Sequence, residues 1–223
     1  MKPLADNLWL LHYKLPILGE YLGRNVTIIR LASGELVIHS TGPFSPEDVA
    51  AISALGTPAY LVDAITLHDT FAKQAHDAFP NLPYYAPAGF SEIVELPTEL
   101  LDRPPAAWQG ELDVLELAGH DATPEFVFLH RPSRTLIVTD LMFNVEDDAP
   151  LGVRMMSLLQ VGLQHAPGMP RPEKLMVKDK EAFKGSLDTI MSWDFDRVIV
   201  GHGEPIETGG KAKLAEAFQA AGF

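Results

Sequence analysis

The 223-residue sequence contains no cysteine. This absence excludes a disulfide framework, a cysteine nucleophile and thiolate ligands to a metal. Any transition-metal site in the chain must therefore be built from histidine, aspartate and glutamate. That set of ligands suits zinc, iron or manganese.

The sequence also lacks a long hydrophobic run. No stretch approaches the roughly 18 apolar residues of a membrane-spanning helix. The apolar stretch at residues 8–11 is too short for the core of a signal peptide and is followed by His12 and Lys14. We therefore predict a cytoplasmic protein that does not associate with a membrane.

Basic residues are scarce: 17 Lys and Arg against 30 Asp and Glu give a formal net charge of −13. So acidic a chain is a poor partner for nucleic acid or an anionic membrane, and we expect a small-molecule substrate instead. The 47% hydrophobic content is that of an ordinary globular protein. The length corresponds to one domain covering residues 1–223.

Strand and helix patterns are interleaved along the whole chain. Strands are predicted at residues 25–32, 35–39, 59–62, 82–86, 93–96, 112–117, 126–130, 135–139 and 197–200. Helices are predicted after the cap Ser45-Pro46-Glu47-Asp48 and at residues 71–79, 153–164, 181–193 and 211–221, and residues 97–107 form a Pro-rich connection. This order predicts an α/β protein whose sheets are covered by helices on the outside.

Several His and Asp residues fall where a predicted strand ends and a loop begins. Side chains at the ends of several strands can converge on one rim of a sheet, and imidazoles and carboxylates bind divalent cations. Each residue also has a structural alternative, such as a helix cap for Asp69 or a loop brace for Asp140. The candidate ligands are His68, Asp69, His120, Asp140 and His202.

The end of the chain carries the most specific motif. A predicted helix, the strand Arg197-Val198-Ile199-Val200 and the turn Gly201-His202-Gly203 resemble the C-terminal signature of the metallo-β-lactamase superfamily. Gly119-His120 and Thr139-Asp140 resemble two further metal-binding elements of that superfamily, in the same order. The resemblance implies an αββα four-layer sandwich of the metallo-β-lactamase type.

The main metal motif of the superfamily, His-x-His-x-Asp-His, is altered in this chain. In its place stands Ala64-Ile65-Thr66-Leu67-His68-Asp69, so Ala64 and Thr66 replace two histidines of the first metal site. His39 likewise replaces an aspartate at the end of an early strand. The resemblance therefore implies one ion of zinc, iron or manganese, held by some of the five candidate ligands.

The early hairpin narrows the resemblance further. Arg30-Leu31, Gly34, Leu36 and His39-Ser40 are similar to the hairpin of a domain-of-unknown-function branch of the superfamily with a modified metal loop. This similarity supports the architecture more than a particular activity.

Two functions stay open on the sequence. The first is a mononuclear metal-dependent hydrolase of an ester, thioester, lactone or phosphoester, with Asp140 and His68 as the catalytic residues. The second is a catalytically inactive binding or regulatory protein on the same scaffold, because two ligands are lost and a fold does not determine a function. A dinuclear β-lactamase is disfavoured, since too much of the first site is missing.

The long segment at residues 144–172 lies between the candidates Asp140 and His202. We expect this segment to lie near the cleft formed by the candidate ligands, where it could act as a lid or a specificity element. Its predicted helix could pack on the domain or form the contact of a homodimer.

Overall fold

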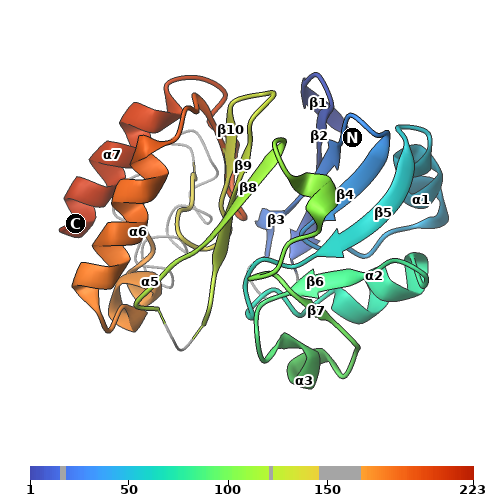
Figure 1. The fold of residues 1–223 in the computed structure, drawn as a ribbon, viewed down its shortest axis with the longest axis horizontal. Helices are drawn as coiled ribbons and strands as arrows, with labels where there is room; N and C mark the ends of the chain where they lie inside the picture. The colour runs from blue at the N-terminus through green and yellow to red at the C-terminus, as the bar shows by residue number, and fades with distance from the viewer. Residues whose placement is uncertain (16–18, 121–122, 146–166) are drawn as a thin grey trace.

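The computed structural model of the protein describes residues 1–15, 19–120, 123–145 and 167–223 (Figure 1). Its strands form a sheet of seven and a sheet of four. The first follows chain order: β1 (Lys2–Ala5), β2 (Leu8–Leu15), β3 (Gly19–Arg30), β4 (Glu35–His39), β5 (Thr57–Val62), β6 (Tyr84–Ala86) and β7 (Glu99–Leu100). The second has the order β11-β10-β9-β8, with β8 (Leu112–Glu116), β9 (Phe126–His130), β10 (Thr135–Ile137) and β11 (Arg197–Ile199).

The described α-helices lie on the outer faces of these sheets. They are α1 (Pro46–Ser53), α2 (Ala72–Ala78), α3 (Phe90–Val94), α5 (Arg171–Met176), α6 (Lys180–Ser192) and α7 (Gly210–Ala221). A short 3-10 helix, η1 (Ala106–Trp108), instead contributes Trp108 to the hydrophobic cluster between the sheets. Figure 1 shows α5, α6 and α7 beyond the second sheet, and α1 and α2 beyond the first.

Three hydrophobic clusters separate the layers. The central cluster lies between the sheets and includes Leu8, Ile29 and Phe128. A second packs the outer face of the first sheet against α1, α2 and α3, and a third packs the outer face of the second sheet against α6 and α7. The protein is therefore an αββα four-layer sandwich, as the resemblance to the metallo-β-lactamase superfamily implies.

The alternation of side chains along a strand explains why both faces are apolar. Neighbouring side chains point to opposite faces, so Ile29 of β3 joins the central cluster while Ile28 faces the helices. In β9, Phe128 likewise faces the other sheet and Leu129 faces the helices. A continuous apolar run is what a strand buried on both faces requires.

Two local predictions are confirmed in detail. The hairpin forms with β3 and β4 antiparallel, and Ser45 caps α1 in a capping box with Asp48. The predicted strand at residues 93–96 is wrong. Phe90 and Val94 are buried one helical turn apart in α3, which ends at Val94, and residues 95 and 96 form the turn that follows it.

Other elements were not predicted. They are β1 and β2 at the N-terminus, β7 inside the Pro-rich connection, and α5 at the end of a segment expected to be irregular. The predicted helix at residues 153–164 lies outside the described residues. Within the described part of the chain, no helix has the length and apolar character needed to cross a membrane.

His39, at the end of β4, is a buried imidazole in an apolar setting. Its side chain packs edge-on against Phe128 with ring centroids 4.7 Å apart, and its Nε2 atom has no hydrogen-bond partner. Burial lowers the pKa of His39 to about 4. The folded protein therefore holds this ring neutral in a pH range where the unfolded chain would protonate it.

A pH dependence of stability follows. Because the folded pKa of His39 lies below the unfolded value of about 6.5, its contribution is present above that pH and is lost as the pH falls towards 4. The difference corresponds to about 3 kcal/mol. Chemical denaturation at several pH values should show a smaller acid loss of unfolding free energy in His39→Leu than in the wild type. Parallel curves for the two proteins would contradict this assignment.

Candidate metal site

Three of the five candidate ligands stand at the ends of strands on one rim. His68 lies in the loop that follows β5 (Thr57–Val62). Asp140 and His202 each lie three positions beyond paired residues, Ile137 of β10 and Ile199 of β11. β10 and β11 are parallel, and Asp140 and His202 follow the paired residues by the same number of positions. The two side chains therefore lie side by side at the same end of the sheet.

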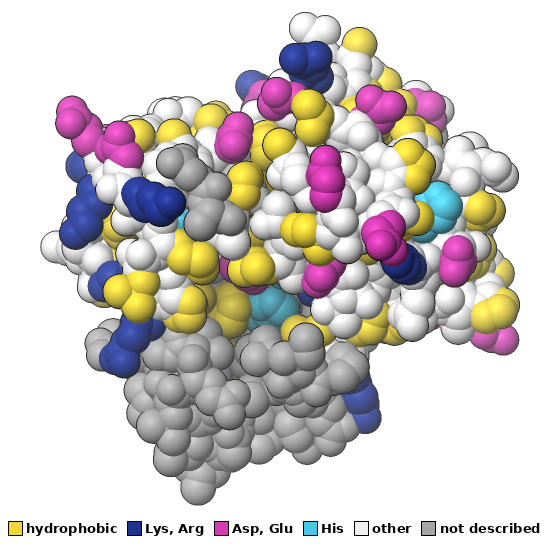
Figure 2. Space-filling model, turned by 90° about the horizontal axis from the view of Figure 1, so that it is seen from below, with side chains coloured by type: hydrophobic (Ala, Val, Ile, Leu, Met, Phe, Trp, Pro, Cys, Tyr) yellow, Lys and Arg dark blue, Asp and Glu magenta, His cyan; other side chains and the backbone are white. Residues whose placement is uncertain are grey.

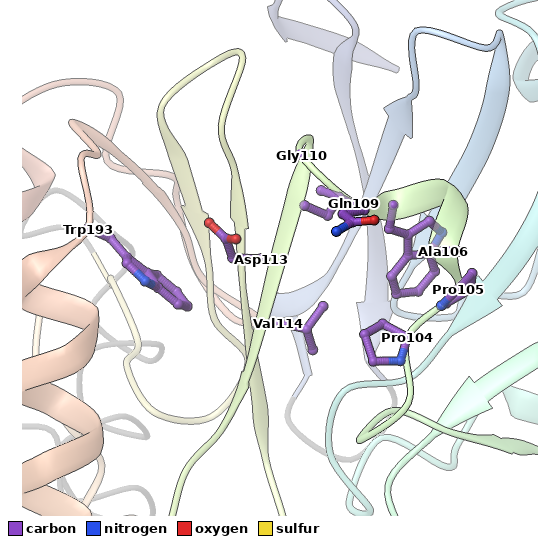
Figure 3. A pocket seen from close by; sticks show the side chains of 10 residues that line it. Pro104, Pro105, Ala106, Gln109, Gly110, Asp113, Val114 and Trp193 are labelled. Carbon is purple, nitrogen blue, oxygen red and sulfur yellow. The ribbon is translucent and has the colours of Figure 1, made fainter.

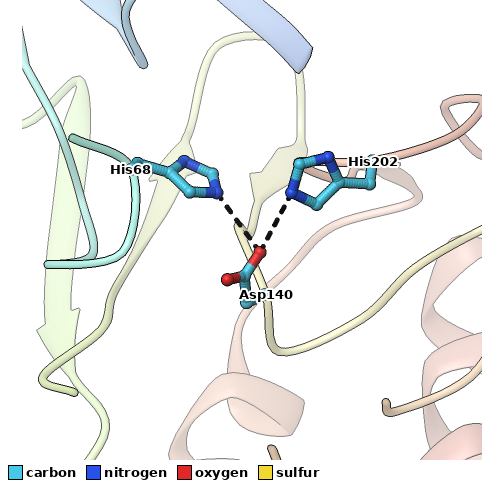
Figure 4. A group of neighbouring side chains, drawn as sticks. All are labelled: His68, Asp140 and His202. Atoms are coloured by element: carbon cyan, nitrogen blue, oxygen red, sulfur yellow. Dashed lines mark hydrogen bonds and ion pairs between the residues drawn. The ribbon is translucent and has the colours of Figure 1, made fainter. Parts of the chain in front are cut away.

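These three side chains converge on one point (Figure 4). Asp140 Oδ1 lies 3.2 Å from His68 Nε2 and 3.3 Å from His202 Nε2. One ligand atom from each residue lies within 4.8 Å of the others. Both imidazoles are buried, and the carboxylate is half-buried. The site thus offers two ring nitrogens and one carboxylate oxygen from three separate elements.

The electrostatics keep the imidazole of His68 neutral and the carboxylate charged. Burial, followed by the positive charge of Arg24, lowers the pKa of His68 to about 3. Burial alone would raise the pKa of Asp140, but the neighbouring His68 and His202 outweigh it and hold that pKa well below its ordinary value. A neutral imidazole and an ionised carboxylate are the forms that bind a metal.

The orientation of His202 is determined by its other ring nitrogen. His202 Nδ1 lies 2.6 Å from the carbonyl oxygen of Gly23 in β3. A carbonyl can only accept, so Nδ1 carries the proton of this hydrogen bond. In the neutral ring, Nε2 then presents a lone pair to Asp140 Oδ1, which is also an acceptor. Two acceptors this close require a proton or a cation between them.

Asn25 of β3 clamps the turn that carries His202. Its Nδ2 donates to the carbonyl oxygens of Val200 and Gly203, at 2.8 and 2.7 Å, while its Oδ1 lies 2.8 Å from His12 Nδ1. Asn25 N also donates to the Gly201 carbonyl. A strand of the first sheet therefore positions a ligand that belongs to the second sheet.

The other two candidates lie outside this cluster. His120 is buried, with Nδ1 2.8 Å from the Thr123 carbonyl oxygen and Nε2 3.2 Å from Glu173 Oε1 of α5. Burial opposes charging of the ring, but Glu173 outweighs it and raises the pKa of His120. Asp69 is exposed, and α2 begins at Ala72 without a side-chain cap.

A surface pocket of about 480 Å³ lies away from this cluster (Figure 3). It is bordered by Pro104 and Pro105, by the start of β8 and by Trp193. Trp193 precedes β11, so the pocket lies at the end of the second sheet opposite to Asp140 and His202.

Figure 2, which views the molecule from below Figure 1, shows a histidine side chain at the surface bordered by hydrophobic side chains.

Comparison with known proteins assigns the chain to a family. The family described as a domain of unknown function, DUF4336, matches residues 5–172. The chain belongs to this family. No curated protein sequence matches it.

Solved structures show which fold this DUF4336 chain has. The metallo-β-lactamase DIM-1 is 14% identical with a TM-score of 0.63, covering 99% of this chain and 96% of its own. The mono-zinc form of FIM-1 from Pseudomonas aeruginosa is 12% identical with a TM-score of 0.62, covering 99% and 95%. TMB-1 is 13% identical with a TM-score of 0.60, covering 100% and 97%. The chain has the metallo-β-lactamase fold.

The first metal site of the superfamily does not fit this DUF4336 chain. Ala64 contributes only a methyl group, which is buried in the cluster between the sheets. Thr66 is buried and replaces the second histidine. The remaining member, His120, is engaged by the carboxylate of Glu173. Among the described residues, His68, Asp140 and His202 are the one group of three His, Asp or Glu side chains close enough together to hold a metal ion.

Glu125 is a second buried acid near this altered region. Its Oε1 accepts from the backbone N–H groups of Thr139 and Leu141, at 2.9 and 3.3 Å, which flank Asp140. Burial, with the nearby charges of Glu173 and Asp140, raises the pKa of Glu125 to about 8. Glu125 thus braces the loop that presents Asp140.

Sequence reasoning missed the residues that support the ligands. Gly23 acts through its carbonyl, and Arg24, Asn25, Ser40 and Glu173 come from elements remote in sequence. The one visible signal was Arg24-Asn25, a charged and an amide residue at the start of an apolar strand pattern.

The Gly-His-Gly turn gives a stability prediction. Gly203 has φ +93, and a Cβ there would lie 2.1 Å from the Asn144 carbonyl oxygen. Gly34 has φ +87, but nothing lies within 4 Å of its Cβ position. Gly34→Ala should cost about 1 kcal/mol of unfolding free energy, and Gly203→Ala should cost at least about 2 kcal/mol more. Equal losses in denaturation experiments would show that the turn tolerates a side chain.

Proposed function

We propose that this protein is a metal-dependent hydrolase with a mononuclear site formed by His68, Asp140 and His202, acting on an ester, thioester, lactone or phosphoester. The observation that supports it best is the distance of 3.3 Å between His202 Nε2 and Asp140 Oδ1 in a ring whose Nδ1 contacts the Gly23 carbonyl oxygen. A cation between these atoms resolves the conflict of two acceptors, and His68 supplies a third ligand.

The spacing of the donor atoms fits such an ion. Zinc binds nitrogen and oxygen at about 2.0–2.2 Å, so neighbouring ligands of a tetrahedral ion lie about 3.4 Å apart. The separations of 3.2 and 3.3 Å agree with that spacing. Three protein ligands on zinc leave the fourth position open, as in catalytic sites. Zinc, iron and manganese all suit imidazole with carboxylate.

In this proposal the three residues have different roles in metal binding and proton transfer. His68 and His202 hold the ion with Asp140 Oδ1, while no described residue donates a hydrogen bond to Asp140 Oδ2. This second oxygen lies on a half-buried side chain and can accept a proton during the reaction. A bound divalent cation supplies Lewis acidity, which polarises a carbonyl or phosphoryl oxygen and makes water a better nucleophile.

The metal content of the purified protein tests the site. After reloading with zinc, manganese or iron and removal of free metal, elemental analysis should find one ion per wild-type chain. His202→Ala should hold less than about a tenth of that amount, because breaking a three-ligand set removes most of the affinity. His76→Ala, a change on α2 away from the cluster, is the matched control and should keep the ion.

Two further variants test the reduction to one site. Asp69→Asn and His120→Gln should both retain one ion, since neither side chain belongs to the cluster. No stable ion in the wild type would refute the proposal and favour the inactive binding protein. Two ions, one of them lost in His120→Gln, would show a dinuclear site.

Turnover tests the reaction class. The metal-loaded protein should hydrolyse at least one chromogenic ester, thioester, lactone or phosphoester, with a rate that follows the metal content. His202→Ala should lose about 100-fold or more of that rate, because the metal supplies the main electrostatic stabilisation. Turnover that persists unchanged in His202→Ala would place the chemistry elsewhere.

A further inference from the structure

Ser40 combines a strained backbone with a buried polar side chain. It follows β4 and has φ +67, in the left-handed region that residues other than glycine rarely adopt. Its N–H donates to the Val62 carbonyl at 2.8 Å, which ties this conformation to the end of β5. Strained residues that the surrounding structure holds in place are concentrated at functional sites.

The hydroxyl of Ser40 lies between two side chains. Arg24 Nη1 donates to Ser40 Oγ at 3.4 Å, and Ser40 Oγ lies 3.2 Å from His68 Nδ1. All three side chains are buried. A serine hydroxyl has one proton and two lone pairs, so it can accept from Arg24 and still serve His68 as donor or acceptor.

The contact with His68 matters because of the opposite ring nitrogen. His68 Nε2 is the atom that faces Asp140 and, under the proposed function, the metal. When Nε2 binds a cation, the proton of the neutral ring stays on Nδ1 and needs an acceptor. Ser40 Oγ is the side-chain oxygen placed to provide it. A bound cation also strengthens Nδ1–H as a donor, so this hydrogen bond stabilises the loaded state more than the free state.

Arg24 anchors Ser40 through the hydrogen bond from its guanidinium to the serine hydroxyl. This guanidinium is buried, and burial lowers the pKa of Arg24, while the nearby carboxylates of Asp63 and Asp140 oppose that shift. Asp63 is itself held by Thr41 Oγ1 at 2.8 Å and by Tyr84 Oη. Arg24 therefore belongs to a buried polar cluster that continues from the metal site into the first sheet.

We infer that Ser40, anchored by Arg24, is a positioning residue that orients His68 for metal binding. The left-handed backbone at Ser40 directs its hydroxyl to both Arg24 and His68. This inference rests on the proposed metal site, and the experiment below separates failure of the two.

The test compares Ser40→Ala with Ser40→Gly by zinc competition against a chromophoric chelator. Both variants lack the hydroxyl, but glycine adopts φ +67 without strain. Each should bind zinc about tenfold or more weakly than the wild type. Ser53→Ala, at the exposed end of α1, should bind like the wild type. Unfolding of the metal-free proteins should show Ser40→Gly at least as stable as Ser40→Ala.

The outcomes are distinct. Wild-type affinity in either Ser40 variant, with zinc bound by the wild type, overturns the role of the hydroxyl and leaves the metal site standing. If only Ser40→Ala binds weakly, the backbone and not the hydroxyl is responsible. Absence of zinc binding in the wild type overturns both the proposed function and this inference. Should Ser40→Ala not fold, Ser40→Gly still decides the question.

Arg24→Lys tests the anchor. Lysine keeps the charge but lacks the planar guanidinium whose Nη1 reaches Ser40. Zinc affinity should fall severalfold, and less than in Ser40→Ala. Unchanged affinity would remove Arg24 from the assignment.

Discussion

The hydrogen bond from His202 Nδ1 to the Gly23 carbonyl is the constraint on which the site depends. It turns Nε2 towards Asp140 and leaves that nitrogen without a proton in the neutral ring. It also joins a strand of one sheet to a turn of the other, with Asn25 holding the same turn through two carbonyls. The geometry of the His68, Asp140 and His202 cluster is thus a consequence of how the two sheets meet at one rim.

The neighbouring region shows what lies at the positions where the resemblance to the superfamily would place the first metal site. Where the superfamily places histidines, Ala64 fills the core between the sheets, and His120 is paired with Glu173 of α5. The contact between His120 and Glu173 links the loop after β8 to α5. Three hydrophobic clusters hold the four layers of the fold together.

The motifs, taken in their order along the chain, were enough to predict the four-layer fold. The expectation that side chains at strand ends converge on one rim correctly grouped His68, Asp140 and His202. Local pattern could not distinguish α3 from a strand, since residues 93–96 are too few to establish a period. Asp69 and His120 also follow strand patterns, but Asp69 is exposed, and His120 is buried against Glu173, a partner distant in sequence. The supports Gly23, Arg24 and Ser40 act through backbone geometry and long-range contacts. One domain over the whole chain and a homodimer stay predictions.

Anomalous X-ray diffraction at the zinc edge, from crystals grown with zinc, tests the central claim most directly. A mononuclear site predicts one strong peak at about 2.0–2.2 Å from His68 Nε2, His202 Nε2 and a carboxylate oxygen of Asp140. A peak beside His120 and Glu173, or none between the three ligands, would contradict it.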